Sequence, residues 1–367
     1  MMRIDVKKII AVFLMLLAIE RTFLCSSEHT SWSTLKEKAV IFSGNANYGL
    51  AEEVVKYLDV PLGDAYVGRF NDGEIRISVN TNVRNKDVFI IQSNCPSDIQ
   101  SVNDNLMELF LMVRTLKRAS AASITAVIPY YGYARQDRKT SGRVPISAAD
   151  VAMMLEGAGV DRIVTIDLHC GQIQGFFQGI PVDNLYASPL FTSYFSSKDL
   201  HNIVVVSPDA GGVERAKRFM EDLGRRGTHA EMALISKQRE IPGVVGSMAL
   251  IGDVKGATAI IIDDLCDTGG TLVKAAKLLK EHGAHRVFAA ITHPVFSCTA
   301  LELIRNSEID DMVVTNTIPL RGEAPQNIHN ISVAALLGEA IRRIQYGESI
   351  SELFEVPSSI QLSHRNL

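Results

Sequence analysis

The chain has 367 residues, of which 47% are hydrophobic and 21% are charged, and its formal net charge is −4. This composition excludes a disordered or fibrous protein, and the lack of a basic excess argues against a nucleic-acid-binding protein. At roughly 100–200 residues per domain, the length predicts two domains or one large one. The five cysteines include no CxxC pair, so neither a disulfide framework nor a zinc site is indicated.

The N-terminal segment differs from the rest of the chain. Residues 9–19 form an unbroken apolar run that follows Arg3, Lys7 and Lys8. A membrane span takes about 20 residues, so the run predicts no stable span, and a basic start before such a run is typical of a signal peptide. A buried N-terminal helix or an upstream start codon would give the same pattern. We expect a targeting-like segment over residues 1–25 within a leader and linker at 1–38. The cysteines of the rest of the chain follow no disulfide or metal-binding spacing. Free thiols of this kind suit the cytoplasm, or an organelle with a reducing interior.

From residue 39 onward, short apolar runs alternate with helical stretches. The runs that suit strands are 39–43, 87–93, 123–129, 162–167, 202–207, 257–264, 286–292 and 311–315. Several of them are continuously apolar, which is typical of parallel strands buried on both faces. Helices are predicted at 104–118, 146–158, 272–282 and 332–346. The alternation predicts an α/β fold with parallel sheets.

Two further features bear on the organisation. The turn signal at 71–73, between 66–70 and 74–79, predicts a hairpin. The number of parallel runs exceeds what one small sheet holds, so we expect two similar domains at 39–185 and 186–356. A tail would follow at 357–367.

The strongest motif is the string at residues 260–271, in which an apolar strand ends in Asp263 and Asp264 and a Gly-Gly turn precedes a helix. Backbone N–H groups at a helix N-terminus form an anion site, and glycines let the chain approach a phosphate closely. Thr268 and Thr271 add hydroxyl donors, and the two carboxylates suit sugar hydroxyls. An ordinary strand-to-helix turn is the alternative, but it does not require the complete acidic and Gly-Gly string.

This string resembles the phosphoribosyl-diphosphate-binding signature of the phosphoribosyltransferase-type fold. Further strings, in the same order, resemble the ribose-phosphate diphosphokinase family of the common phosphate-activated class. They lie at 42–45, 68–74, 103–109, 133–138, 167–169, 172–177, 207–212 and 339–343. The resemblance implies two domains of that fold, each a mainly parallel sheet flanked by helices. It also implies that ATP and ribose 5-phosphate react, with Mg²⁺, to give AMP and 5-phosphoribosyl 1-diphosphate. Inorganic phosphate as an activator, and a homodimer that assembles to a homohexamer, are implied as well.

The resemblance assigns roles to residues of this chain. The ribose 5-phosphate site it implies comprises Arg239, Asp263, Asp264, Asp267, Thr268, Gly269, Gly270 and Thr271. The ATP site comprises Phe70, Asp72, Gly73, Glu74, Arg135 and Gln136. His169 and Asp209 match the metal positions, and Lys237 and Arg239 match a catalytic basic pair.

Several of these positions also have a purely structural explanation, and two other functions are compared with the one that the resemblance implies. A plain hairpin turn would explain 71–73, and a solvated loop would explain 135–138. A phosphoribosyltransferase would need only one domain and no ATP-binding half. A non-catalytic regulatory subunit of the same family would be expected to lose the ATP or cation-loop residues, which are present here. Cys298 stands where the family usually has Gly, in a region implied for regulation.

Overall fold

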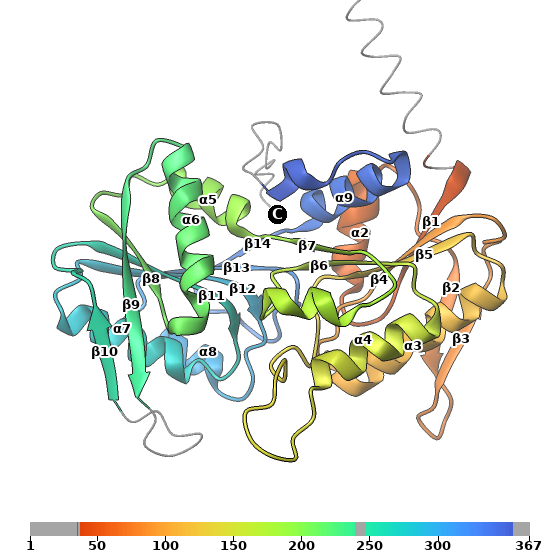
Figure 1. The fold of residues 1–367 in the computed structure, drawn as a ribbon, viewed down its shortest axis with the longest axis horizontal. Helices are drawn as coiled ribbons and strands as arrows, with labels where there is room; N and C mark the ends of the chain where they lie inside the picture. The colour runs from red at the N-terminus through yellow and green to blue at the C-terminus, as the bar shows by residue number, and fades with distance from the viewer. Residues whose placement is uncertain (1–34, 36, 239–246, 355–367) are drawn as a thin grey trace, which may run out of the picture.

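The computed structural model describes residues 35, 37–238 and 247–354. The predicted targeting segment, Arg239 and the predicted tail at 357–367 lie outside the described residues. Figure 1 shows two α/β halves side by side, each built on its own sheet. In the part of the chain that the structure describes, no helix is both long and apolar enough to cross a bilayer.

The first sheet has the order β1-β4-β5-β6-β7 and is parallel throughout. Its strands are β1 (Ala39–Ser43), β4 (Asp87–Ile91), β5 (Ser123–Ile128), β6 (Arg162–Ile166) and β7 (Val182–Leu185). One face packs on α3 (Val102–Arg118) and α4 (Ser147–Ala158), and the other on α2 (Tyr48–Tyr57). The predicted hairpin is confirmed as β2 (Ala65–Arg69) and β3 (Ile75–Val79).

The second sheet has the order β10-β9-β8-β11-β12-β13-β14 and is parallel except for the β9–β10 pair. Its strands are β8 (Ile203–Ser207), β9 (Ala230–Gln238), β10 (Ser247–Ile251), β11 (Thr258–Cys266), β12 (Arg286–Pro294), β13 (Asp311–Thr315) and β14 (Ile328–Ile331). Helices α5 (Ser188–Ser196) and α6 (Val213–Arg225) cover one face. Helices α7 (Gly270–Glu281) and α8 (Ala300–Arg305) cover the other.

The predicted α/β fold with parallel sheets is confirmed, and each of the eight predicted runs is a strand. The four predicted helices are also present, the last as α9 (Ala334–Tyr346). The sequence prediction did not include α2, α5, α6, α8 or strands β7, β9, β10 and β14. Three of these elements are very short, with four residues in β7, four in β14 and six in α8, and leave little pattern in the sequence.

The two halves share a hydrophobic core. Helix α9 follows the second sheet in the chain but packs beside α2 of the first half, as Figure 1 shows. The approach is close, because a Cβ added at Gly338 would lie 2.4 Å from the ring of Tyr57. Leu50, Phe191 and Leu337 belong to one buried cluster that runs through both halves. The domain boundary at 185/186 stays a prediction.

Hydrogen bonds join the carboxyl ends of β6 and β12, which belong to different sheets. The buried ring of His293 donates from Nε2 to the carbonyls of Ile166, at 3.0 Å, and Asp167, at 3.2 Å. Thr292 Oγ1 donates to Asp167 Oδ2 over 2.6 Å. Ligands of α/β sheets bind outside the carboxyl ends of the strands. The fold therefore brings two such edges to one place.

Candidate active site

The loop between β11 and α7 lines a cavity of about 170 Å³. Five of the residues predicted to hold ribose 5-phosphate are among its lining residues: Asp263, Asp267, Thr268, Gly269 and Thr271. Gly269, just before α7, has a φ of +77°, a left-handed conformation that favours glycine. Gly270 begins the helix, whose first N–H groups receive no side-chain cap. The cavity is therefore suited to an anion at the helix N-terminus.

Asp263 and Asp264 share a partly buried arginine, Arg215, that the sequence prediction missed. Arg215 Nη1 lies 3.3 Å from Asp263 Oδ1 and 3.2 Å from Asp264 Oδ1. Arg215 belongs to the buried face of α6, which also carries Ala216, Phe219 and Leu223. Arg215 could have been predicted from the sequence as a charged residue on the otherwise apolar face of an amphipathic helix.

The two carboxyl groups differ in their electrostatics. Burial, followed by the charge of Asp264, raises the pKa of Asp263, against the opposing charge of Arg215. Burial would also raise the pKa of Asp264, but Arg215 and the hydrogen bond from His169 hold it well below its usual range. Asp264 is therefore the ionised member of the pair at neutral pH.

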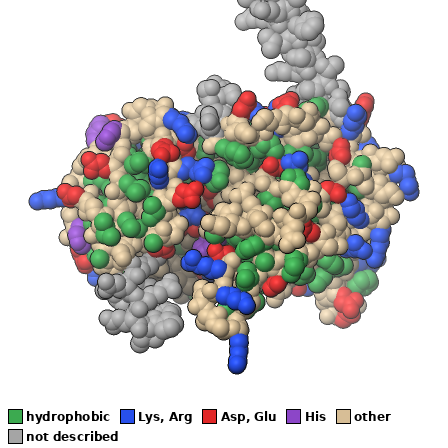
Figure 2. Space-filling view, in the orientation of Figure 1, with side chains coloured by type: hydrophobic (Ala, Val, Ile, Leu, Met, Phe, Trp, Pro, Cys, Tyr) green, Lys and Arg blue, Asp and Glu red, His purple; other side chains and the backbone are tan. Residues whose placement is uncertain are grey.

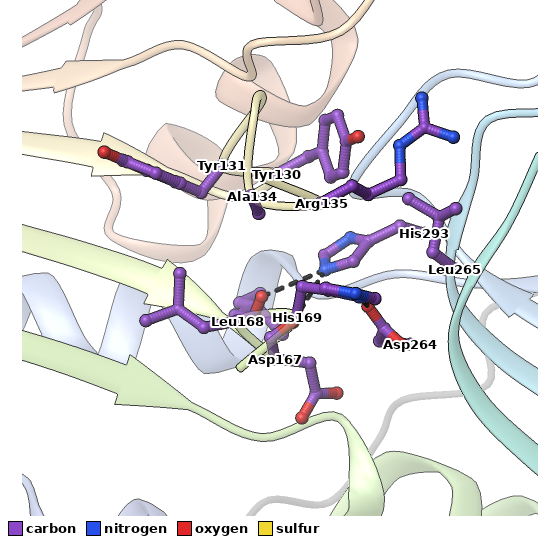
Figure 3. A pocket seen from close by; sticks show the side chains of 11 residues that line it. Tyr130, Tyr131, Ala134, Arg135, Asp167, Leu168, His169, Asp264, Leu265 and His293 are labelled. Atoms are coloured by element: carbon purple, nitrogen blue, oxygen red, sulfur yellow. Dashed lines mark hydrogen bonds and ion pairs between the residues drawn. The ribbon is translucent and has the colours of Figure 1, made fainter. Parts of the chain in front are cut away.

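His169 reaches Asp264 from the other half of the molecule. Its Nδ1 lies 2.8 Å from Asp264 Oδ2, and this hydrogen bond raises the pKa of His169, although burial opposes the shift. Figure 3 shows the two side chains meeting in a narrow pocket, with Tyr130 and Arg135 across from them. Asp264 lines this pocket, whereas Asp263 lines the cavity of the loop.

Arg135 lies where the pocket meets the loop. Its Nη1 is 2.6 Å from Asp267 Oδ2. Figure 2 shows basic and acidic side chains gathered where the two halves meet. Gln136, predicted beside Arg135 in the ATP site, instead accepts a hydrogen bond from Ser147 Oγ and lines neither the pocket nor the cavity.

Asp209, predicted as a metal ligand, follows β8 and caps its own loop. Its Oδ1 accepts hydrogen bonds from the N–H groups of Gly211, at 3.0 Å, and Gly212, at 3.2 Å. Its charge acts on Arg215 and Asp263, which places it near the diacid pair. Among the described residues, no group of three or more His, Cys, Asp or Glu side chains is arranged to hold a metal ion.

Comparisons with known proteins agree with this architecture. Residues 39–159 match the family model of the N-terminal domain of ribose phosphate pyrophosphokinase. Residues 226–355 match that of the phosphoribosyl synthetase-associated domain. The ribose-phosphate pyrophosphokinase of Marinomonas sp. is 53% identical over 86% of this chain and 99% of its own length. That of Ralstonia nicotianae is 53% identical over 87% of this chain and 98% of its own.

The chain belongs to the ribose-phosphate pyrophosphokinase family. A solved structure agrees: phosphoribosylpyrophosphate synthetase from Mycobacterium smegmatis is 41% identical with a TM-score of 0.78. The match covers 84% of this chain and 99% of that one. The resemblance to ribose-phosphate diphosphokinases, another name for this family, is confirmed, and so is the fold that it implies.

Four residues predicted for ATP lie away from the site in this single chain. Phe70, Asp72, Gly73 and Glu74 form the tip of the β2–β3 hairpin, at the opposite end of Figure 1 from α7. The turn is closed locally, since Glu74 N donates to Asp72 Oδ1 over 3.0 Å. Half of Phe70 is exposed, and Arg76 lies over its ring. Their role in this pyrophosphokinase family member stays a prediction.

Lys237, the first residue of the predicted catalytic pair, belongs to the last part of β9. Lys237 is paired with Met248 through the backbone of the β9–β10 hairpin. The Lys237 side chain and Arg239 lie outside the described residues. Their roles also stay predictions.

Proposed function

We propose that this protein transfers the diphosphate group of ATP to the anomeric hydroxyl of ribose 5-phosphate. The products are 5-phosphoribosyl 1-diphosphate, for nucleotide biosynthesis, and AMP. The observation that carries the proposal is the site itself. An anion-binding loop with a diacid pair faces a histidine and an arginine from the other half, in a chain of this family.

The loop after β11 is the proposed ribose 5-phosphate site. The 5-phosphate would lie at the start of α7, where N–H groups of the loop and the hydroxyls of Thr268 and Thr271 donate to it. Asp263 and Asp264 would accept hydrogen bonds from the ribose hydroxyls. Holding the sugar at both ends fixes the direction of its anomeric hydroxyl, and such orientation is a large part of catalysis in phosphoryl transfer.

The pocket beside this loop is the proposed place for the ATP phosphates. Arg135 would exchange Asp267 for a phosphate, because guanidinium–phosphate hydrogen bonds are charge-assisted and strong. Gln136 and the hairpin residues Phe70, Asp72, Gly73 and Glu74 would serve the same substrate. The hairpin would reach a site only in an assembly, so we propose that a second copy supplies it within a homodimer or homohexamer.

Mg²⁺ fits the residues at this edge. Mg²⁺ takes oxygen ligands and usually binds through one or two protein groups together with substrate phosphates. Asp209 offers a carboxylate, and His169 lies at the end of β6. We assign these two residues to the ion, which would neutralise phosphate charge when bound. Because Asp264 engages Nδ1 of His169, only Nε2 is left to face the ion or its waters.

Lys237 and Arg239 would neutralise the charge that develops on the reacting phosphates, with Arg239 nearer the ribose phosphate. The carboxyl ends of β8 and β11 are adjacent in the sheet, and β9 lies on the other side of β8. We further propose inorganic phosphate as an activator, and a targeting segment at residues 1–25, within the leader and linker at 1–38, that directs the protein to an organelle with a reducing interior.

The test is the formation of AMP from ATP by the purified full chain with Mg²⁺ and inorganic phosphate. AMP should appear only when ribose 5-phosphate is added, in equal amount to 5-phosphoribosyl 1-diphosphate. No AMP under these conditions would refute the proposal. Consumption of 5-phosphoribosyl 1-diphosphate with a nucleobase, without use of ATP, would identify a phosphoribosyltransferase instead.

A further inference from the structure

We propose that Arg215 is a positioning residue for the sugar, which holds Asp263 in place for the ribose hydroxyls by tying it to Asp264. This inference rests on the proposed function, because it concerns how that site binds ribose 5-phosphate. Neither the motif at 260–271 nor the predicted site residues include Arg215, which lies 48 residues before Asp263 in the chain.

The fold brings Arg215 to the diacid pair through the pairing of β8 with β11. The two strands are parallel neighbours, with Val206 opposite Ile261. Asp263 and Asp264 follow Ile261 on one strand, while the other leads through a short 3₁₀ turn into α6. Arg215 lies in the first turn of α6 and points back at the end of β11.

One nitrogen serves both acids. Arg215 Nη1 contacts Oδ1 of Asp263 and Oδ1 of Asp264, at 3.3 and 3.2 Å. The side chains are 17% exposed for Arg215, 23% for Asp263 and 5% for Asp264, so little water screens the contacts. Asp264 is also held from the opposite side by His169, at 2.8 Å. Asp264 is therefore the fixed point, and Asp263 is linked to it in two ways: Asp264 N donates to Asp263 Oδ1 over 2.9 Å, and Arg215 contacts both carboxyl groups.

The two acids face different spaces. Asp263 lines the cavity of the phosphate-binding loop, and Asp264 lines the pocket that holds His169 and Arg135. Arg215 lines neither of them. It can therefore act on a sugar only through the carboxylates, which is why we assign it a positioning role.

The charges around Arg215 support a fixed cation at this point. Burial would lower the pKa of Arg215, but Asp264, Asp263, Asp167 and Asp209 together outweigh that effect. Without the guanidinium, Asp263 and Asp264 would face each other with the other acids nearby. Asp263 Oδ1 would then be held by the hydrogen bond from Asp264 N, at 2.9 Å, without the guanidinium beside it, so the side chain would be fixed less firmly in the position that a sugar hydroxyl needs.

The primary test uses the full chain and compares Arg215→Met with the matched control Lys217→Met. Lys217 is on the same helix, is 64% exposed and pairs only loosely with Glu221, at 3.8 Å. Calorimetric titration with ribose 5-phosphate, without ATP, should give a dissociation constant about 10- to 100-fold higher for Arg215→Met. Lys217→Met should match the wild type. Arg215→Lys should recover part of the affinity, because one positive nitrogen makes both contacts.

Three further readouts separate positioning from general destabilisation. The KM for ribose 5-phosphate should rise with Arg215→Met, whereas an unfolded fraction would lower only the apparent kcat. The loss of affinity caused by Arg215→Met should be smaller with 2-deoxy- or 3-deoxyribose 5-phosphate than with ribose 5-phosphate, since one sugar hydroxyl is then missing. The double variant Arg215→Met/Asp263→Asn removes both partners of the contact, and it should bind ribose 5-phosphate no more weakly than Asp263→Asn alone.

Arg215→Met with a ribose 5-phosphate affinity within about twofold of the wild type would overturn the inference. If Arg215→Met does not fold, the double variant decides: an additional loss beyond Asp263→Asn would show that Arg215 acts independently of Asp263. A wild type that forms no AMP would instead refute the proposed function, so the two failures are distinguishable.

Discussion

Arg135 and Asp267 form an ion pair across the two halves of the molecule, with 2.6 Å between Nη1 and Oδ2. The arginine follows β5 of the first sheet, and the aspartate belongs to the loop after β11 of the second. Each is predicted to contact a different substrate, ATP for Arg135 and ribose 5-phosphate for Asp267. The pair therefore links the two halves of the proposed reaction before either substrate binds.

Arg135→Met should weaken the binding of ATP more than the binding of ribose 5-phosphate. Loss of a charge-assisted hydrogen bond to phosphate corresponds to about a 10-fold or larger rise in the KM for ATP. Arg135 is 54% exposed and its ion pair adds little stability, so the midpoint of thermal unfolding should hardly change. Steady-state kinetics with each substrate varied in turn, and a thermal melt, check both statements. An unchanged KM for ATP would remove Arg135 from the ATP site.

Lys237→Ala should lower turnover severely, by about 100-fold or more, while ribose 5-phosphate binds nearly as in the wild type. The reason is that the proposed role of Lys237 is to neutralise charge that exists only in the transition state. Turnover numbers and calorimetric titration with ribose 5-phosphate are the measurements. Weaker binding with normal turnover would contradict this role.

Cys298→Gly should stabilise the protein. Cys298 is exposed and has a φ of +56°, which costs a non-glycine residue roughly 1–2 kcal/mol. Glycine avoids that cost but loses about 0.5–1 kcal/mol through greater freedom of the unfolded chain. We expect a modest net rise in the unfolding midpoint. Cys298→Ser is the control, because serine keeps the strained backbone, and an equal rise with both variants would rule out strain as the cause.

His293 should make the protein less stable as the pH falls. Burial lowers the pKa of His293 below its ordinary value near 6.5, so the unfolded state takes up its proton first. The stability from neutral His293 is complete above pH 6.5 and is lost as the pH falls toward its lower folded pKa. The slope is at most about 1.4 kcal/mol per pH unit.

The variant His293→Gln isolates this contribution. His169 has a raised pKa, so its contribution is lost as the pH rises, and only a difference between variants separates the two histidines. Denaturant unfolding between pH 5.5 and 8 should show a shallower pH dependence in His293→Gln. Parallel curves for the two proteins would contradict the prediction.

Local patterns predicted those parts of the fold that depend on neighbouring residues. The continuously apolar run 203–206 is β8, because a strand buried on both faces needs no alternation. The string at 260–271 predicted the loop and the start of α7, because phosphate binding requires glycines and a helix N-terminus in direct succession. By contrast, β10 is a five-residue strand at the edge of the second sheet, and it was not predicted.

By itself, the sequence determined the class of fold, the family resemblance and the phosphate-binding loop, since each is encoded by residues close together in the chain. Only the tertiary structure decided which distant side chains meet: His169 with Asp264, Arg135 with Asp267, and Arg215 with both acids of the pair. These contacts depend on strand order and on the shared core that joins the two halves. They leave no periodic signal, because each partner lies many residues away on a separate element.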